Sequence, residues 1–598
     1  MAYDSIPARF LAQGAQRPEA PAYFAKVDGA WRATRWRDHV QETRLVARAL
    51  MAEGVGPGST VGILGFNRPE WVAMATATLL TGGAPAGIYT TCSAEEVQYI
   101  LAHAEALVVL VEDAAQWEKV RKVRDRLPAL KRVVLMKGAP AVDDPMVVTW
   151  EAFVASGEAT DDAEVEKRVA AIEPAGLSTL IYTSGTTGPP KGVMLSHENI
   201  AWTATAAAKL VNGQPGQVML SYLPLSHIAE QMFSIHGAIT IGMTIYFAES
   251  IEKVPENLKE AQPDVFFGVP RIWEKFFAAA NTKLKDATGA KAAIVTWARG
   301  VAMDVHSRRD RGEAVPGLLE LQHRLADKLF YSKFKQAVGL GRAKICVSGA
   351  APVGREVLEF FTSLDLPVRE VYGQSEDTGP TSFNLPGDTR LGTVGKPVAG
   401  VTVKIADDGE ILVKGPNVFL GYFKDAEATA ATLQDGWLCS GDLGKLDADG
   451  FLVITGRKKE ILITSGGKNI TPKNIEEDLK RHDLIGEVVV IGDRRPYLTA
   501  LLVLRPEGLA RWAKAHDRDA AELAKTAHDD AGVRAELQAA VDDVNSRLAR
   551  VETIKRFTVL PRPLDIEHGE LTPTLKIKRA IVYKVWNESI EAMYAEKA

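Results

Sequence analysis

Short apolar runs alternate with helix-like segments through the first half of the chain. Residues 59–66 (STVGILGF) and 106–112 (ALVVLVE) have the apolar, β-branched composition of buried strands. Between them, residues 68–83 have helical periodicity and end in a Gly pair, and residues 93–106 begin with a Ser cap followed by acidic residues. Strands that alternate with helices in this way predict stacked α/β units. Because 598 residues are too many for one core, we expect about two to four folding units.

The pattern changes in the second half. Residues 281–341 are rich in Lys, Arg, Ala and Leu, which predicts a helical insertion on the surface. Short strands and turns follow, and residues 401–418 predict a β-hairpin. From about Lys459 a new unit combines strands with a long helical stretch. We therefore expect a boundary between an N-terminal domain of residues 1–458 and a C-terminal domain of residues 459–598.

Composition is that of an ordinary globular protein and argues against several classes of function. Lys and Arg number 71 against 76 Asp and Glu, and the formal charge of −5 offers no electrostatic footprint for nucleic acid. Three scattered cysteines have no metal-type spacing, which argues against a disulfide framework and a zinc site. No apolar run reaches the about 18 residues of a membrane span, and no secretory signal is expected. We expect a cytoplasmic protein, and a peripheral association with a membrane stays open.

One loop carries most of the chemistry that the sequence predicts. Residues 182–197 (YTSGTTGPPKGVMLSH) follow an apolar strand and precede a helical run. Small hydroxyl residues and glycines allow backbone N–H groups to approach phosphate oxygens, and Lys191 adds a positive charge. The segment is not a Walker loop, because Pro190 stands before the Lys. Taken alone, the segment has a second interpretation as a flexible turn.

The loop resembles the phosphate-binding loop of the adenylate-forming superfamily, which includes acyl-CoA synthetases, luciferases and the adenylation domains of peptide synthetases. Further segments match that superfamily in its usual order, so the resemblance spans about residues 61–579. They are LPLSHIAE (223–230), FFGVPRIWEK (266–275), SGAAP (348–352), VYGQSE (371–376), SGDL (440–443), GRKKEILITSGGKNI (456–470) and GELTPTLKIKR (569–579). The resemblance implies an α/β fold class, with a large N-terminal domain of stacked α/β subdomains plus a β-rich subdomain, and a small mobile α+β C-terminal domain.

The resemblance also implies a nucleotide site. ATP or AMP would contact residues from the loop, from two strand ends and from the β-rich part: Ser184, Gly185, Thr186, Thr187, Gly188, Gly349, Ala350, Ala351, Tyr372, Gly373, Gln374, Asp442 and Arg457. In this arrangement Tyr372 stacks on adenine, Asp442 accepts hydrogen bonds from the ribose diol, and Arg457 contacts ribose and phosphate with its planar donor fork. Glu376, with Thr183 as hydroxyl partner, would hold Mg²⁺, because hard cations prefer carboxylate oxygens. A solvated loop Glu and a turn Asp are the alternatives at these two acidic positions.

Three residues are implied in catalysis: Lys576, His227 and Lys191. Lys576 aligns with the superfamily's adenylation lysine, where a cation stabilises the charge that develops in the transition state. His227 would lie beside the acyl carboxylate and shape the second half-reaction. Alternatively, His227 is a structural histidine whose hydrogen bonds are made within the protein, and Lys576 is an ordinary solvent-facing lysine.

Two further assignments concern the thioester step. Lys459 aligns with the hinge about which the C-terminal domain rotates between half-reactions, and hinges of this kind are a few residues that absorb backbone changes. Ser465, Gly466 and Gly467 would line the pantetheine tunnel of CoA.

The implied reaction is ATP-dependent ligation of a long-chain fatty acid to CoA through acyl-AMP, with Mg²⁺ as cofactor and ATP and CoA as co-substrates. A fatty acyl-AMP ligase that delivers to a carrier protein is one alternative, but the span from Asp442 to Ile470 has no obvious extra insertion. An inactive lipid-binding homologue is the other, and the set of site residues argues against decay. The sequence predicts no particular oligomeric state.

Overall fold

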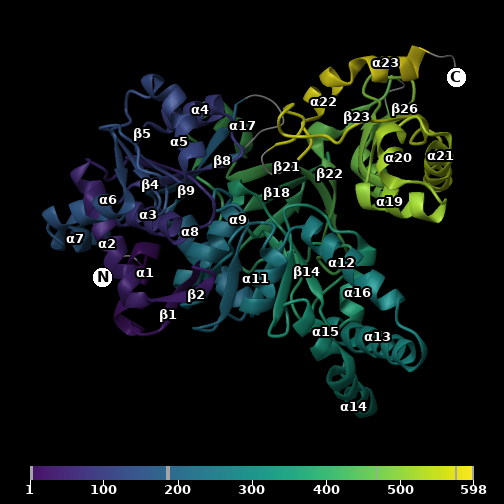
Figure 1. The fold of residues 1–598 in the computed structure, drawn as a ribbon, viewed down its shortest axis with the longest axis horizontal. Helices are drawn as coiled ribbons and strands as arrows, with labels where there is room; N and C mark the ends of the chain where they lie inside the picture. Colours follow the sequence, from purple (N-terminus) through teal and green to yellow (C-terminus); the bar gives the residue numbers. More distant parts are fainter. Residues whose placement is uncertain (1–3, 184–188, 466–467, 573–575, 596–598) are drawn as a thin grey trace.

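The computed structural model describes residues 4–183, 189–465, 468–572 and 576–595. In these residues three large sheets lie before the end of strand β22 (Leu452–Arg457), and a two-stranded and a three-stranded sheet follow (Figure 1). The first part combines mixed α/β sheets with a β-rich sheet, and the last part is a small α+β unit. The predicted fold class is therefore confirmed.

The eight-stranded sheet positions the predicted phosphate loop. Its strands, in spatial order, are β19 (Gly421–Tyr422), β9 (Lys191–Ser196), β8 (Leu177–Thr183), β4 (Ala84–Ile88), β3 (Thr60–Leu64), β5 (Ala106–Val111), β6 (Arg132–Leu135) and β7 (Val147–Thr149). Strands β3, β4 and β5 are parallel, and every residue of β3 and β4 is buried, as expected for a sheet covered on both faces. Strands β8 and β9 are antiparallel, so the loop joins their adjacent ends.

The loop is shorter than the sequence suggested. Lys191 pairs with Thr183 across the two strands and is the first residue of β9. The helix after it, α8 (His197–Leu210), begins with a capping box between Ser196 and Asn199.

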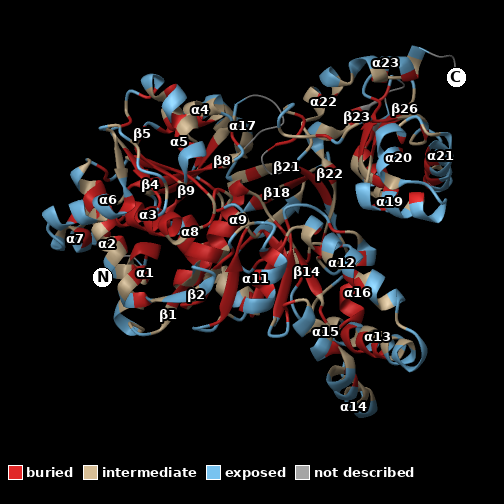
Figure 2. Ribbon diagram, in the orientation of Figure 1, coloured by how far each residue is buried: buried red, intermediate tan, exposed pale blue. Residues whose placement is uncertain are grey.

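Helices cover this sheet and its neighbour. They are α1 (Ile6–Gln16), α2 (Trp36–Ala52), α3 (Pro69–Leu80), α4 (Ala94–Ala104), α5 (Ala114–Val123), α6 (Trp150–Ser156), α7 (Ala163–Ala170), α9 (Ile228–Gln231), α10 (Ala238–Ile241) and α11 (Val254–Ala261). Helix α4 has the predicted Ser cap, because Ser93 and Glu96 form a capping box. Helix α3 is buried along almost its whole length, so the core lies between the two large sheets (Figure 2).

The nine-stranded sheet brings several predicted segments to one edge. Its order is β16 (Lys396–Pro397), β15 (Ser382–Phe383), β14 (Val368–Tyr372), β13 (Ile345–Ser348), β12 (Val265–Gly268), β10 (Val218–Ser221), β11 (Thr244–Phe247), β1 (Pro21–Val27) and β2 (Ala30–Arg35). Strands β10, β12, β13 and β14 are parallel, so their carboxyl ends lie at the same edge. The segments that follow these ends carry His227, Gly349 and Glu376, and ligands bind at such edges.

The predicted helical insertion is confirmed, with a different start. Helix α12 (Pro270–Lys285) already begins beside β12, and α13 (Gly289–Asp310), α14 (Gly317–Ala326) and α15 (Ser332–Ala337) follow. Helix α16 (Arg355–Ser363) packs against α13. Helix α14 lies at the lower end of the molecule in Figure 1, away from the sheets.

The β-rich part contains the predicted hairpin. Strands β17 (Thr402–Ile405) and β18 (Glu410–Lys414) are antiparallel, and the turn between them has Gly409 at φ 86°, which favours glycine. Strand β21 (Trp437–Leu446) pairs with β18, with β20 (Leu433–Gln434) and with β22. Helix α17 (Ala426–Thr432) precedes β20.

The C-terminal unit has apolar clusters on both faces of its sheet. Strands β25 (Ile485–Ile491), β26 (Leu498–Leu504) and β27 (Ile554–Val559) form that sheet, and β23 (Leu462–Ile463) pairs with β24 (Asn469–Ile470). On β25, Val488 and Val490 belong to one cluster, and Val489 and Ile491 belong to the other, as the alternation of a strand requires. The long helical stretch of the sequence is three helices, α19 (Pro506–Ala515), α20 (Ala520–Thr526) and α21 (Ala531–Asn545).

A buried ion pair ties the end of the chain to this unit. Arg579, the first residue of α22 (Arg579–Val585), donates through Nη2 to both carboxylate oxygens of Glu476 at 2.6 Å. Glu476 lies on α18 (Pro472–Lys480), and the last helix is α23 (Asn587–Ala595). Removing one partner of such a pair costs about 3–5 kcal/mol, because the other charge stays buried. This pair therefore fixes α22, which follows the segment of Lys576, against α18. None of the described helices is long and apolar enough to cross a bilayer.

Candidate active site

The metal-ligand candidates lie where β9, β19 and the turn after β14 meet. The Tyr422 hydroxyl on β19 donates to Glu376 Oε1 at 2.9 Å. The ammonium of Lys191 lies 4.8 Å from the centre of the Tyr422 ring and 3.9 Å from Asp425 Oδ2. Thr183 ends β8 beside Lys191, and its hydroxyl lies 3.5 Å from the Lys191 carbonyl oxygen. Thr183, Lys191 and Glu376 therefore belong to one region of the structure, with Tyr422 between the lysine and the acid.

Part of the predicted phosphate site lies outside the described residues. This applies to Ser184, Gly185, Thr186, Thr187 and Gly188. The strand residues on either side, Thr183 and Lys191, face each other in register.

The predicted nucleotide contacts that follow β13 and β14 include two glycines with little room for a side chain. Gly349 follows β13, and a Cβ built on it would lie 2.6 Å from Val371 Cγ1. A Cβ on Gly373 would lie 1.4 Å from the Gly379 carbonyl oxygen, so only glycine fits there. Ala350, which precedes Ala351, has a left-handed φ of 67°, an uncommon conformation for a residue other than glycine.

Asp442 is the centre of the predicted ribose site. Its Oδ2 accepts a hydrogen bond from the Tyr372 hydroxyl at 2.8 Å, and its Oδ1 accepts one from Arg457 Nε at 2.9 Å. Asp442 and Arg457 are paired residues of β21 and β22, whereas Tyr372 ends β14. Gln374 donates through Nε2 to the Ser440 carbonyl oxygen at 3.3 Å. Burial and the Asp442 charge raise the pKa of Tyr372, so its hydroxyl stays a donor.

His227 caps the first turn of α9 and is neutral. Its Nδ1 accepts a hydrogen bond from the Ala229 amide at 3.1 Å, which leaves the ring proton on Nε2. Burial, with a smaller contribution from the charge of Lys576, lowers the pKa of His227 to about 4. His227 therefore both caps a helix and lies within the electrostatic reach of Lys576.

Lys576 joins this group from the C-terminal unit. The backbone amide of Lys576 donates a hydrogen bond to Thr572 Oγ1 at 3.0 Å, which helps to fix the backbone at Lys576. The side chain has solvent access, yet protein atoms surround it on most sides, and this desolvation lowers its pKa. Arg457 lowers the pKa as well, while the charges of Asp442 and Glu376 raise it. The structure thus brings a lysine near the C-terminus together with the acids of two sheets.

The hinge and CoA candidates lie directly after β22. Lys459 is exposed in a short 3-10 turn (Lys458–Glu460), and the neighbouring Lys458 forms ion pairs of 2.7 Å with Asp408 and Glu410. Ser465 is exposed, and its amide donates to the Arg495 carbonyl oxygen at 2.9 Å. Gly466 and Gly467 lie outside the described residues.

Two residues of this region were missed from the sequence. Tyr422 contacts Glu376 across 46 positions of sequence, and no short motif marks it. Lys473, at the start of α18, lowers the pKa of Lys576 and is itself influenced by the charges of Glu460, Glu477 and Asp442. Its place just after the predicted CoA loop was the only available clue.

A buried carboxyl lies one turn beyond His227. Glu230 Oε1 accepts hydrogen bonds from the hydroxyls of Ser221 at 2.7 Å and Ser234 at 2.6 Å, and it lies 3.4 Å from Asn67 Nδ2. Burial raises the pKa of Glu230 to about 7 despite these hydrogen bonds. The network holds the start of α9, and therefore His227, against β10.

Comparison with known proteins identifies the family. A model described as "AMP-binding enzyme" matches residues 10–423, and one described as "AMP-binding enzyme C-terminal domain" matches residues 459–598. The chain belongs to the AMP-binding enzyme family. This adenylate-forming family is the one that the sequence motifs resemble, so that prediction is confirmed.

Several relatives match over nearly the whole chain. The long-chain-fatty-acid–CoA ligase FadD15 of Mycobacterium bovis is 36% identical over 99% of this chain and 97% of its own. The long-chain-fatty-acid–CoA ligase ACSBG2 of Xenopus laevis is also 36% identical, and the match covers 96% of this chain and 82% of the relative's length. Human ACSBG2 is 34% identical, and the match covers 96% of this chain and 90% of the relative's length.

Solved structures share the fold of this family member. The adenylation domain of a carboxylate reductase from Mycobacterium chelonae has a TM-score of 0.75 at 21% identity, covering 99% of this chain and 91% of its own. The o-succinylbenzoate CoA synthetase of Bacillus subtilis, in complex with ATP and magnesium ion, has a TM-score of 0.68 at 22% identity. That match covers 96% of this chain and 98% of the synthetase.

The raised pKa of Glu230 predicts a pH-dependent stability difference. A carboxyl whose folded pKa is about 7, against an ordinary 4.5, destabilises the fold progressively as pH rises through that window. Glu230→Gln removes this term, so relative to the parent it should gain stability between about pH 4.5 and 7, by up to about 3 kcal/mol. Calorimetric melting of both proteins at several pH values measures the difference. Substitution of an exposed glutamate, Glu198→Gln, serves as control. The prediction would be contradicted if the melting temperatures of the parent and of Glu230→Gln changed equally with pH.

Proposed function

We propose that this AMP-binding enzyme is an ATP-dependent long-chain fatty acid–CoA ligase, which forms acyl-AMP and pyrophosphate and then acyl-CoA and AMP. The observation that carries the proposal is that Lys576 lies among Asp442, Arg457 and Glu376, close enough to act on the pKa of His227. These groups come from two sheets before the end of β22 and from the C-terminal segment that carries Lys576, and their charges suit a site that binds both a nucleotide and a carboxylate. The full-length relatives named as long-chain ligases support the same substrate class.

In the adenylation step, the fatty carboxylate attacks the α-phosphate and pyrophosphate leaves. Tyr372 stacks on adenine, and Asp442 and Arg457 hold the ribose and phosphate. Lys576 donates to the carboxylate and to the α-phosphate oxygens, where its charge stabilises the transition state. Because burial and Arg457 lower its pKa, the cation is held by the charges of Asp442 and Glu376 and by the anionic substrates themselves.

A magnesium ion fits the acid side of the site. Glu376 is half-buried, Tyr422 occupies one lone pair of Oε1, and Oε2 accepts no hydrogen bond from the residues that the structure describes. We propose that Glu376 and Thr183 hold Mg²⁺, as hard cations prefer oxygen ligands and keep phosphate oxygens in their shell. When bound, the ion neutralises phosphate charge, and Tyr422 orients the carboxylate that receives it.

For the thioester step, Lys576 has to leave the site and the CoA thiol has to enter. We propose that Lys459 is the hinge of this movement between domains of residues 1–458 and 459–598, and that the loop of Ser465, Gly466 and Gly467 lines the pantetheine path. Neutral His227 would then contact the acyl carbonyl through Nε2–H. The α18 and β23–β24 segments follow the hinge without an insertion in the described residues, which favours CoA over a carrier protein as acceptor.

The first test removes the cation of the adenylation step. Lys576→Ala should lower acyl-AMP formation about 10²–10³-fold, the usual effect of losing one transition-state charge contact. Thioester formation from supplied acyl-AMP should remain near the parent rate, because Lys576 acts only in the first half-reaction. Both steps are measured separately with a long-chain acid, with the exposed Lys584→Ala of α22 as control. Equal loss of both half-reactions would remove the assignment.

The second test addresses the metal. Glu376→Gln keeps the shape and the hydrogen bond from Tyr422 but replaces a carboxylate with a neutral amide, a poor hard-cation ligand. The apparent Mg²⁺ affinity in turnover should weaken about 10- to 100-fold, as for other losses around a metal site. Titration of activity with Mg²⁺ at saturating ATP measures it, and the exposed Glu427→Gln is the control. An unchanged Mg²⁺ titration would exclude Glu376 as the ligand.

The third test addresses the hinge. Proline fixes φ and removes the N–H, so Lys459→Pro should restrict rotation while Lys459→Ala leaves it free. The proline variant should form acyl-AMP in a single turnover and then stall before the thioester, because the arrangement with Lys576 in the site is retained. Acyl-AMP and acyl-CoA are quantified together, and circular dichroism checks folding. A folded proline variant with both half-reactions at parent rates would place the hinge elsewhere.

A further inference from the structure

Helix α14 exposes four leucines on one side. Leu318, Leu321, Leu325 and Leu329 are 71%, 62%, 50% and 42% exposed. Their spacing of three and four residues places them on one face of α14 and of the turn that continues it. We call these four residues the leucine stripe. Single exposed leucines are ordinary, but four on successive turns form a continuous apolar surface.

The inner side of α14 packs on α13. Ala326 and Tyr331 are fully buried there, in a small cluster with Ala298 and Ala302 of α13. A surface helix normally buries its apolar stripe and exposes its polar face. Here one side packs on α13 and the other faces outward, as the exposed colouring of α14 in Figure 2 shows. The leucine stripe is therefore an apolar surface on the side of α14 that faces away from α13.

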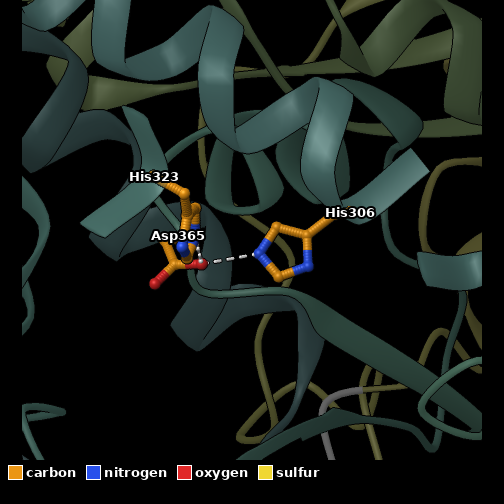
Figure 3. Close-up of side chains that lie close together, drawn as sticks. All are labelled: His306, His323 and Asp365. Atoms are coloured by element: carbon orange, nitrogen blue, oxygen red, sulfur yellow. Dashed lines mark hydrogen bonds and ion pairs between the residues drawn. The ribbon is translucent and has the colours of Figure 1, made fainter. Parts of the chain in front are cut away.

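A single carboxylate fixes the orientation of α14. Asp365 Oδ1 accepts hydrogen bonds from His306 Nε2 of α13 at 2.7 Å and from His323 Nε2 of α14 at 2.9 Å (Figure 3). Its Oδ2 lies 2.8 Å from the ammonium of Lys335 on α15. Burial opposes ionisation of Asp365, but these partners outweigh it and lower its pKa. The ammonium beside the carboxylate disfavours a metal ion at this cluster, so we interpret the cluster as an anchor that keeps the leucine stripe facing outward.

The insertion around the leucine stripe is basic in an acidic protein. Residues 281–341 contain 11 Lys and Arg against six Asp and Glu, a formal charge of +5, while the whole chain has −5. Five exposed lysines of this segment form no ion pair with any residue in the described part of the chain: Lys283, Lys285, Lys291, Lys328 and Lys333. Their charge is therefore available to an anionic partner.

We propose that the leucine stripe docks on an anionic lipid bilayer. Leucines on one face of a helix and lysines around it are the combination that binds the interface between headgroups and acyl chains. The leucines would enter the upper acyl layer, and Lys328 and Lys333 would contact lipid phosphates. A benefit for catalysis, access to long-chain acids dissolved in the bilayer, rests on the proposed function, whereas the docking itself does not.

The test measures binding of the full chain to vesicles by flotation, without ATP or CoA. The parent should float with vesicles of phosphatidylcholine containing about 30 mol% phosphatidylglycerol, less with pure phosphatidylcholine, and less at high salt. Leu321→Ser with Leu325→Ser should weaken binding at least about tenfold, because it removes apolar area from the interface. Lys328→Gln with Lys333→Gln should weaken binding to the anionic vesicles only.

The matched control substitutes exposed aliphatic residues elsewhere, Val27→Ser with Val551→Ser, which are 53% and 49% exposed and should bind like the parent. Adenylation of a soluble medium-chain acid should be unchanged in every variant, since none of these residues lies in the proposed site. Absence of vesicle binding by the parent would overturn the proposal. So would binding that survives the leucine substitutions, or a parent dimer that these substitutions convert to monomer, which would assign the stripe to a second copy. Vesicle binding by a chain that forms no acyl-CoA would instead refute only the proposed reaction.

Discussion

The carboxylate of Asp442 is the interaction on which the site depends. It accepts hydrogen bonds from Tyr372, at the end of a strand in the nine-stranded sheet, and from Arg457, at the end of the β-rich sheet. Arg457 is also the last residue before the turn that leads to the C-terminal unit. Asp442 is 5% exposed, so losing either partner would leave a buried charge only partly satisfied. One buried acid thus sets the positions of two sheets and of the start of the C-terminal unit.

The charges around Asp442 explain why the C-terminal unit matters. Lys576, Lys473 and Arg457 all lie near Asp442, and repulsion from the other two cations adds to burial in lowering the pKa of Lys576. Three cations this close together suit an anionic ligand, which would offset their mutual repulsion. His227 stays neutral beside it, because burial and the Lys576 charge both lower its pKa. The pKa values of His227 and Lys576 therefore depend on how the C-terminal unit packs against the two sheets.

In the helical insertion, too, a single carboxylate joins several elements. Asp365 connects α13, α14 and α15 through His306, His323 and Lys335. These partly buried side-chain contacts add to the small apolar contact between α14 and α13. A helix held in this way can present apolar side chains to the outside without collapsing onto the body of the protein.

The sequence by itself determined the family, several of the strands and the fold class. Strand β3, the N-terminal cap of helix α4 and the hairpin turn at Gly409 follow from local patterns, because short-range periodicity and turn chemistry act within a few residues. Only the tertiary structure decided that Tyr422 binds Glu376, that Lys576 lies among the acids and that the leucine stripe faces outward. Those outcomes depend on contacts between residues far apart in the chain. Neither hydrophobic periodicity nor a short motif specifies which distant side chain is the partner in such a contact.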